Sequence, residues 1–251
     1  KEKILRSLIV ALLFLFTIPI IFFGQNENEK LRAKNLFFEA VDSYNTEKYQ
    51  DAIIKAKLSN SFNPSEGAYQ IIGLSMFILG DYKGSIKNHS YAIKLNPSPE
   101  NYSDRADAKV SIRDLEGALL DYSAAIKKTS MNNLKIADYF SSRGFVYKNM
   151  KKYYQAINDY TSAININPND PYYFFERSDC YYEVEDYKNA RLDLFEPIVI
   201  KENKIKFYTG LALINLKEGD REDACLYFQS AIEEGYDASS NLKKVFEDIC
   251  N

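Results

Sequence analysis

The sequence is poor in the residues that most catalytic and metal sites require. It contains a single histidine, His89, and only three cysteines, Cys180, Cys225 and Cys250. The cysteines form no CxxC pair, and no histidine stands at metal-ligand spacing from them. Most zinc sites and histidine-based catalytic triads are thereby excluded, and no metal or cofactor is predicted. An odd, sparse set of cysteines also argues against a disulfide framework.

Turn residues and catalytic motifs are scarce as well. Ten glycines and seven prolines in 251 residues are few for an all-β protein with many turns. The chain has no Walker loop, GxGxxG, GxSxG or HExxH motif. We therefore expect no catalytic residues, no small-molecule substrate and no enzymatic activity.

The charge balance is mildly acidic. The net charge is −3, from 32 Lys and Arg against 35 Asp and Glu. Without residues 1–24 these totals fall to 29 and 34, which leaves −5. Phosphate backbones need a positive surface, so nucleic acid is not an expected partner.

Residues 1–24 have the layout of a secretory signal peptide. Lys1, Lys3 and Arg6 precede an apolar run that ends at Gly24. The alternative is an uncleaved anchor, because residues 4–23 are just long enough to span a bilayer. Phe22 stands where a signal peptidase prefers a small residue, which keeps this alternative open. In both cases the rest of the chain is expected outside the cytoplasm, periplasmic or extracellular, and touches a membrane only through residues 4–23 if these are retained.

From residue 33 the chain repeats itself with a period near 34. Small residues recur at separations of 33, 33, 38, 34 and 34, namely at Ala52, Ser85, Ala118, Ala156, Ala190 and Ala224. Apolar residues follow the i, i+3, i+4, i+7 spacing of helices with one buried face. The pattern predicts six two-helix units over 33–236, starting near 33, 66, 99, 137, 171 and 205. We expect a short linker at 25–32, a longer surface loop at 127–137 and a capping helix at 237–251.

The segments GDYKGSIKNHSYAIKLNP (80–97) and YYQAINDYTSAININP (153–168) resemble the tetratricopeptide repeat family. The resemblance covers about residues 31–236. It implies an all-α solenoid, in which six helical hairpins form a right-handed superhelix that binds proteins or peptides on its concave side. The fold by itself names no partner.

The resemblance also implies which side chains face the groove, those at set positions of each first helix. Phe37 and Val41 occupy the places of the first Lys and Asn of the family's carboxylate clamp, so that clamp is absent. A segment with an apolar or aromatic anchor is the more plausible ligand. The candidate groove residues are Phe37, Tyr44, Phe77, Phe145, Tyr172, Phe175 and Tyr182.

Two alternatives to an occupied groove stay open. In the first alternative, several of the candidate rings pack against the next repeat, or the cap and the N-terminal segment fill the groove. In the other alternative, the protein is a structural adaptor that uses its convex face or its ends and leaves the groove empty.

The seventh and twenty-third residues of each unit show a charge pattern. Arginine at the seventh place occurs only with aspartate at the twenty-third, in Arg105/Asp121, Arg143/Asp159 and Arg177/Asp193. The first unit reverses the signs with Glu39/Lys55, while Ile72/Asn88 and Leu211/Tyr227 are uncharged. Because the charges change together, we predict that these residues form structural ion pairs.

Three single residues carry further expectations. Pro197 should end or bend the second helix of the fifth unit at Glu196 or Pro197, since proline removes a backbone donor. His89 stands in a column of buried aromatic residues and is interpreted as a core histidine. Cys225 and Cys250 are interpreted as two packed thiols, with a bridge in an oxidising compartment as the open alternative.

Overall fold

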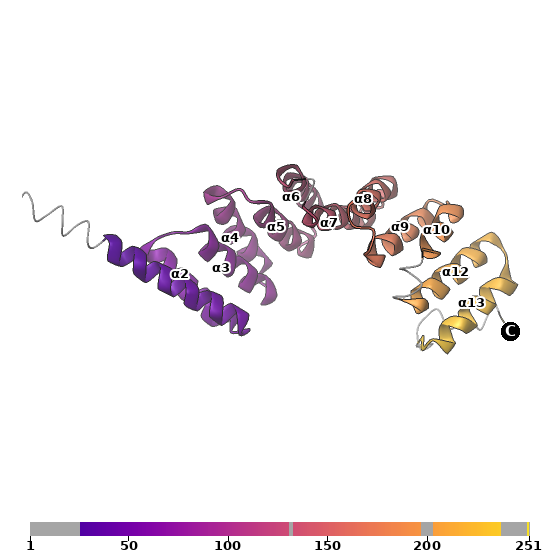
Figure 1. Cartoon of the computed structure of the whole chain (residues 1–251), viewed down its shortest axis with the longest axis horizontal. Coiled ribbons are helices and arrows are strands. Elements are labelled where there is room, and N and C mark those ends of the chain that lie inside the picture. Colours follow the sequence, from indigo (N-terminus) through magenta and orange to yellow (C-terminus); the bar gives the residue numbers. More distant parts are fainter. Residues whose placement is uncertain (1–25, 131–132, 197–202, 237–249, 251) are drawn as a thin grey trace, which may run out of the picture. The chain divides into compact units, whose positions relative to one another are not determined.

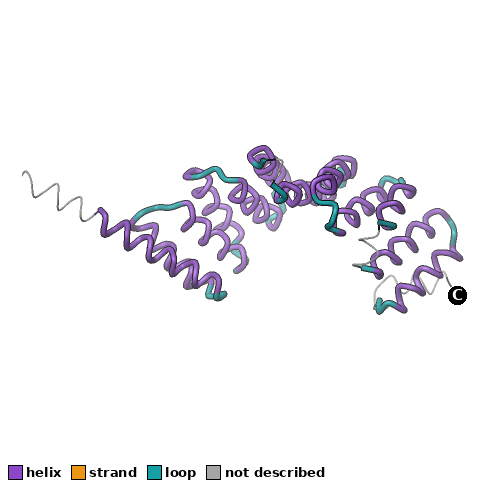
Figure 2. Tube along the Cα trace, in the orientation of Figure 1, coloured by secondary structure: helices purple, strands orange, loops and turns teal. Residues whose placement is uncertain are grey.

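Every regular element in the described part of the chain is a helix. The computed structural model describes residues 26–130, 133–196, 203–236 and 250, and its helices are joined by short turns (Figures 1 and 2). The all-α expectation is therefore confirmed for these residues. Within the same ranges no helix is long and apolar enough to cross a bilayer. The signal peptide or anchor at 1–24 and all of the cap at 237–251 except Cys250 lie outside the described residues.

The chain divides into two compact units at the Asp114–Leu115 junction, which lies inside the third repeat. The first unit contains a helix that includes residues 26–45, followed by α2 (Tyr49–Phe62), α3 (Glu66–Ile78), α4 (Tyr82–Leu95) and α5 (Pro99–Ser111). The second unit contains α6 (Leu115–Lys128), α7 (Lys135–Asn149), α8 (Tyr153–Ile166), α9 (Pro171–Glu183), α10 (Tyr187–Leu194), α12 (Lys204–Glu218) and α13 (Arg221–Glu233). The extra residues of the 38-residue step fall between α6 and α7.

The linker expected at 25–32 is wrong, because the chain is already helical at residue 26. This stretch contains no glycine or proline to interrupt a helix. Lys30 and Glu27, three residues apart, form an ion pair with Nζ 3.0 Å from Oε1. The first helix of the first repeat therefore begins earlier than the period indicated.

Small residues allow the two helices of a hairpin to approach closely. Ala52, Ala118, Ala156 and Ala190 are fully buried where the helices cross. On the opposite helix of the fourth repeat stands Gly144. A Cβ at Gly144 would lie 3.3 Å from the Tyr160 ring, already tighter than most contacts.

The turn between the two helices is the same in all six repeats. Its residue five positions before the small residue has a left-handed backbone, with φ between 57° and 86°, at Glu47, Gly80, Arg113, Lys151, Glu185 and Gly219. Glycine adopts this geometry without strain, whereas the other four residues do not.

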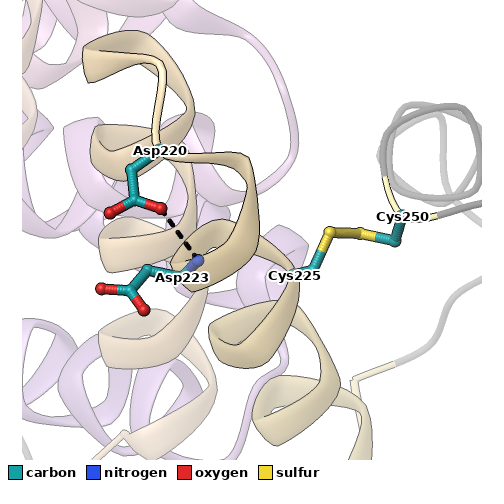
Figure 3. The surroundings of a disulfide bond; sticks show 4 residues. All are labelled: Asp220, Asp223, Cys225 and Cys250. Atoms are coloured by element: carbon teal, nitrogen blue, oxygen red, sulfur yellow. Dashed lines mark hydrogen bonds between the residues drawn. A yellow bond between two sulfur atoms is a disulfide. The ribbon is translucent and has the colours of Figure 1, made fainter.

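An aspartate often follows this turn residue and caps the second helix. Asp81, Asp186 and Asp220 each accept a hydrogen bond from a backbone N–H in the first turn of the helix. Figure 3 shows this bond for Asp220, from the backbone nitrogen of Asp223 at 3.1 Å. Lys48 and Lys152 occupy the same place in the first and fourth repeats and make no side-chain cap.

Helix α10 is short, and it ends earlier than expected. It stops at Leu194, two residues before the predicted end at Glu196 or Pro197. Proline disfavours helical geometry in the preceding residue and its ring clashes with the carbonyl four residues back, here that of Asp193. Pro197 itself lies outside the described residues, so the bend that was the other option is not described.

Candidate functional site

The candidate site is a pocket between the first helices of the fifth and sixth repeats. It has a volume of about 180 Å³ and lies within the second unit. The pocket is lined by Phe175, Glu176, Ser178, Asp179, Tyr182, Leu194, Lys206, Thr209, Gly210, Leu213 and Ile214. Two of the seven candidate groove residues, Phe175 and Tyr182, are therefore brought together here.

The floor of the pocket is apolar and buried. Phe175, Leu194 and Ile214 belong to one buried cluster that also holds Phe174 and Phe207. Phe175 is only 8% exposed, so it serves the core as much as the pocket. Such a preformed apolar cavity is typical of a site that receives one side chain of a ligand.

Gly210 keeps the α12 side of the floor open. A Cβ at this position would come within 2.8 Å of a Leu194 methyl group. The absence of a side chain thus lets α12 approach α10 while the cavity remains beside it.

Two carboxylates at the rim share one lysine. Lys148, from α7, places Nζ 2.9 Å from Glu176 and 2.7 Å from Asp179. Burial lowers the pKa of Lys148, but the two carboxylates outweigh this and raise it above its ordinary value. The two acids thus share a single cation, and this side of the rim keeps one net negative charge.

Lys206 is the other cation at the pocket. Its Nζ lies 5.1 Å from the centre of the Phe175 ring, at cation–π distance. No acidic side chain in the described ranges pairs with it, whereas its neighbour Lys204 pairs with Glu234 at 2.8 Å. The pocket thus combines apolar walls with one ammonium group that has only a ring as its partner.

The remaining candidate groove residues are spread over both units. Phe145 and Tyr172 are 39% and 40% exposed on α7 and α9. Burial, followed by the Glu176 carboxylate, raises the pKa of the Tyr172 phenol to about 12. Both rings are thus partly accessible to a ligand.

The three candidates in the first unit occupy a different setting. Phe37 lines a separate pocket of about 380 Å³, together with Lys30, Lys34 and Gly67 among others. Tyr44 and Phe77 lie with their ring centres 5.7 and 5.4 Å from those of Tyr49 and Tyr82, at the start of the following helix. These last two rings pack against the second helix of their own repeat, whereas the first alternative expected packing against the next repeat.

The structure brings together two of the three predicted arginine–aspartate pairs. Arg143 contacts Asp159 through two hydrogen bonds of 2.8 and 2.7 Å, and Arg177 contacts Asp193 through two of 2.9 and 2.6 Å. The reversed pair Lys55/Glu39 is looser, at 3.9 Å. Arg105 and Asp121 belong to different units, so their geometry is not described.

The sequence reasoning missed a third partner of these arginines. Arg105, Arg143 and Arg177 each donate from Nη1 to a hydroxyl of the preceding repeat, namely Ser90, Ser123 and Thr161, at 2.9 to 3.0 Å. Each hydroxyl stands five residues after the small residue of its repeat. Two repeats after the first have no arginine at the seventh place, and each follows a repeat without this hydroxyl. Lys57 and Phe195 stand at the hydroxyl's place there. The signal was therefore present in the sequence, but only when adjacent repeats are compared.

The interpretation of Cys225 and Cys250 as packed thiols is wrong. The structure joins them in a disulfide, with Cα atoms 5.7 Å apart, between α13 and the last residue but one (Figure 3). The distance lies in the usual range for a bridge. Cysteine count alone could not reveal this, since pairing depends on where the chain's end lies.

His89 lies in the core, as expected. It is fully buried, and neither ring nitrogen has a hydrogen-bond partner among the described residues. Burial, with Arg105 nearby, lowers the pKa of the imidazole to about 4. The histidine is therefore neutral at pH 7, and it belongs to the first unit, whereas the pocket belongs to the second.

The sequence and the fold resemble those of known repeat proteins. Residues 137–170 match the family model of the tetratricopeptide repeat. The Pseudomonas aeruginosa protein pilF superposes with a TM-score of 0.70 over 88% of this chain and 99% of its own, at 15% identity. The chain has a tetratricopeptide repeat fold. The C-terminal part of a tetratricopeptide repeat protein from Cytophaga hutchinsonii gives 0.68 over 78% of each chain, at 19% identity.

Two further relatives share the repeat. YrrB, whose structure is described as having an unusual peptide-binding site, gives a TM-score of 0.58 over 68% of this chain and 86% of its own, at 16% identity. The small glutamine-rich tetratricopeptide repeat-containing protein 2 of Saccharomyces cerevisiae is 28% identical over 98 residues. That match covers 39% of this chain and 28% of the yeast protein. Tetratricopeptide repeat proteins generally mediate protein–protein or peptide binding and are generally non-enzymatic.

Proposed function

We propose that this protein is a non-enzymatic scaffold that binds a protein or peptide on the concave face formed by the first helices of its repeats. The observation that carries the proposal is the pocket between α9 and α12, with its apolar floor and its polar rim. A hairpin solenoid needs its first helices for packing on one side only, and the other side stays available to a ligand. The likeness to YrrB supports the same reading, because the published description of that protein names a peptide-binding site.

We also propose that the protein acts outside the cytoplasm, either released or anchored through residues 4–23. The basic start and the apolar run support export. The Cys225–Cys250 bridge supports it independently, because disulfides persist in oxidising compartments and are rare in the cytosol. N-terminal sequencing of the exported protein should begin near Gln25, while a membrane-bound chain that retains residues 4–23 would favour the anchor.

A direct test compares two triple variants that keep the fold intact. The first removes groove side chains that are at least partly exposed, with Phe145→Ser, Tyr172→Ser and Leu213→Ser. Phe175 is left in place because its loss would disturb the core. Partners captured by the wild-type protein should be lost from this variant, with helicity unchanged by circular dichroism.

The control variant tests the second candidate function, a structural adaptor. Large side chains on the second helices are more exposed than those in the groove, with Leu120 at 73%, Leu226 at 61% and Leu192 at 58%. These three residues each stand two places after the small residue of their repeat. If Leu120→Ser, Leu192→Ser and Leu226→Ser abolish capture while the groove variant retains it, the second helices form the binding surface and the groove proposal is wrong.

A further inference from the structure

The charges around the pocket are not equivalent. Glu176 and Asp179 share one cation, Lys148. Among the described residues, Lys206 contacts the face of the Phe175 ring and no acidic side chain. A ligand that supplied another cation would share the two acids with Lys148, whereas a ligand that supplied an anion would meet an ammonium that no described acidic side chain pairs.

The apolar lining of the pocket determines which ligand side chain can enter it beside the acidic group. Phe175, Leu194, Leu213 and Ile214 surround a space of about 180 Å³, enough for one large side chain. Lys206 lies at the same ring, so an anion that pairs with it would belong to the residue beside the buried side chain. Pairing would leave the apolar floor free, because the ammonium need only move from the ring toward the anion.

We propose that the pocket binds a peptide through an aromatic or branched aliphatic side chain, with a directly neighbouring acidic side chain paired to Lys206. This inference rests on the proposed peptide-binding function and gives it a sequence preference. The acidic group proposed is a side chain of the ligand, and the experiment below separates it from a terminal carboxylate. An ion pair at such a rim steers and selects a ligand more than it adds affinity.

The test uses acetylated and amidated peptides, which have no terminal charges. Three of them carry the same central sequence with Phe-Glu, Phe-Gln or Phe-Lys, and a fourth carries Gly-Glu. Each is titrated into isotope-labelled full chain and followed by NMR of the backbone amides of α9 and α12. A fifth peptide, with Phe-Gln and a free C-terminus, separates a terminal carboxylate from an acidic side chain.

We expect the Phe-Glu peptide to bind at least about threefold tighter than Phe-Gln, the range of a partly exposed ion pair. Phe-Lys should bind more weakly than Phe-Gln, and Gly-Glu should not bind. The preference should vanish in Lys206→Gln and invert in Lys206→Glu. Lys217→Gln on the same helix is the matched control and should retain it, since Lys217 does not line the pocket.

The outcomes separate this inference from the function on which it rests. Equal affinity for all three Phe peptides, or a preference that survives Lys206→Gln, overturns the acidic neighbour and leaves an apolar-anchored groove. Tighter binding of only the free C-terminus overturns the side-chain assignment. If no Phe peptide perturbs α9 or α12, the pocket is not a peptide site and the proposed function fails with it.

Discussion

Arg143 and Asp159 form two parallel hydrogen bonds across the hairpin of the fourth repeat. The guanidinium donates from Nε to Oδ2 at 2.8 Å and from Nη2 to Oδ1 at 2.7 Å. It also lies within 6.0 Å of the rings of Phe140 and Tyr147. Because its third bond reaches Ser123, one side chain ties together both helices of its own repeat and the last helix of the preceding one.

The first prediction concerns this pair. Arg143→Ala should lower the free energy of unfolding by about 3 kcal/mol, because it leaves the buried Asp159 carboxylate without its cation. The cycle with Asp159→Ala, measured by urea unfolding, should show a coupling of about 0.5–3 kcal/mol. Ser123→Ala should cost less, about 1 kcal/mol for one hydrogen bond.

The looser Lys55/Glu39 pair of the first repeat is the internal control. Its atoms are 3.9 Å apart and its side chains are more exposed. Coupling there should stay below about 1 kcal/mol. Additive effects at Arg143 and Asp159 would contradict the structural role assigned to the pair.

The second prediction concerns the left-handed turn residue. Lys151 has φ of 57°, in the place that Gly80 and Gly219 occupy in other repeats. Lys151→Gly should therefore raise the free energy of unfolding by roughly 0.5–1 kcal/mol, since strain is removed at a small entropic cost. Gly219→Ala should lower it. Lys57→Gly, in the exposed middle of α2, is the control and should cost about 1 kcal/mol; stabilisation there too would refute the explanation by turn geometry.

The third prediction concerns the number of thiols that react with a thiol reagent. Cys180 is fully buried, and burial raises the pKa of its thiol to about 12, so a thiol reagent should not label the folded protein. Denaturation without reductant should release one reactive thiol, and denaturation after reduction should release three. Cys180→Ala should remove the first of these signals. Three thiols without reductant would show that Cys225 and Cys250 are not bridged.

The fourth prediction is a pH dependence from His89. The pKa of its imidazole is lowered to about 4 in the folded protein, below its ordinary value of 6.5. Between these values the unfolded chain binds the proton and the folded one does not, so stability rises with pH from about 4 to 6.5. Thermal melts of wild type and His89→Phe over this range should show the wild type losing more stability as pH falls.

The sign of this effect is informative. Asp104 has a carboxylate oxygen 3.9 Å from Nδ1 of His89, too far for a hydrogen bond. If that carboxylate governed the imidazole, the folded pKa would be raised and the wild type would gain stability on acidification relative to His89→Phe. A gain of that kind would overturn the assignment to burial.

Most of the fold was predictable because a repeat provides its own alignment. Helix starts at Glu66, Pro99 and Pro171 fall on the predicted repeat starts, and those of α7 and α12 fall within two residues of them. The small residues that fix the period are those that steric crowding at the helix crossing requires. The start of the first helix escaped prediction because its early turns have no preceding repeat to pack against, so they lack the apolar period that marks the others.

The candidate site was predictable in part. Residue position within the repeat was enough to select Phe175 and Tyr182, since helix geometry sets which side chains share a face. It was not enough to show that Tyr44 and Phe77 pack on the next helix, because that depends on the ring at the start of that helix. The hydroxyl partners of the arginines and the disulfide depend on contacts between repeats or between distant parts of the chain, which no single repeat encodes.

The bridge between Cys225 and Cys250 also changes how the protein would carry force. Because the two sulfurs are bonded, tension applied at the C-terminus enters the fold at Cys225. Residues 226–249 then form a closed loop outside the load path and do not lengthen under pulling. A protein held at this end by a partner would transmit that load directly into α13, and reduction of the bridge would add the length of the intervening chain.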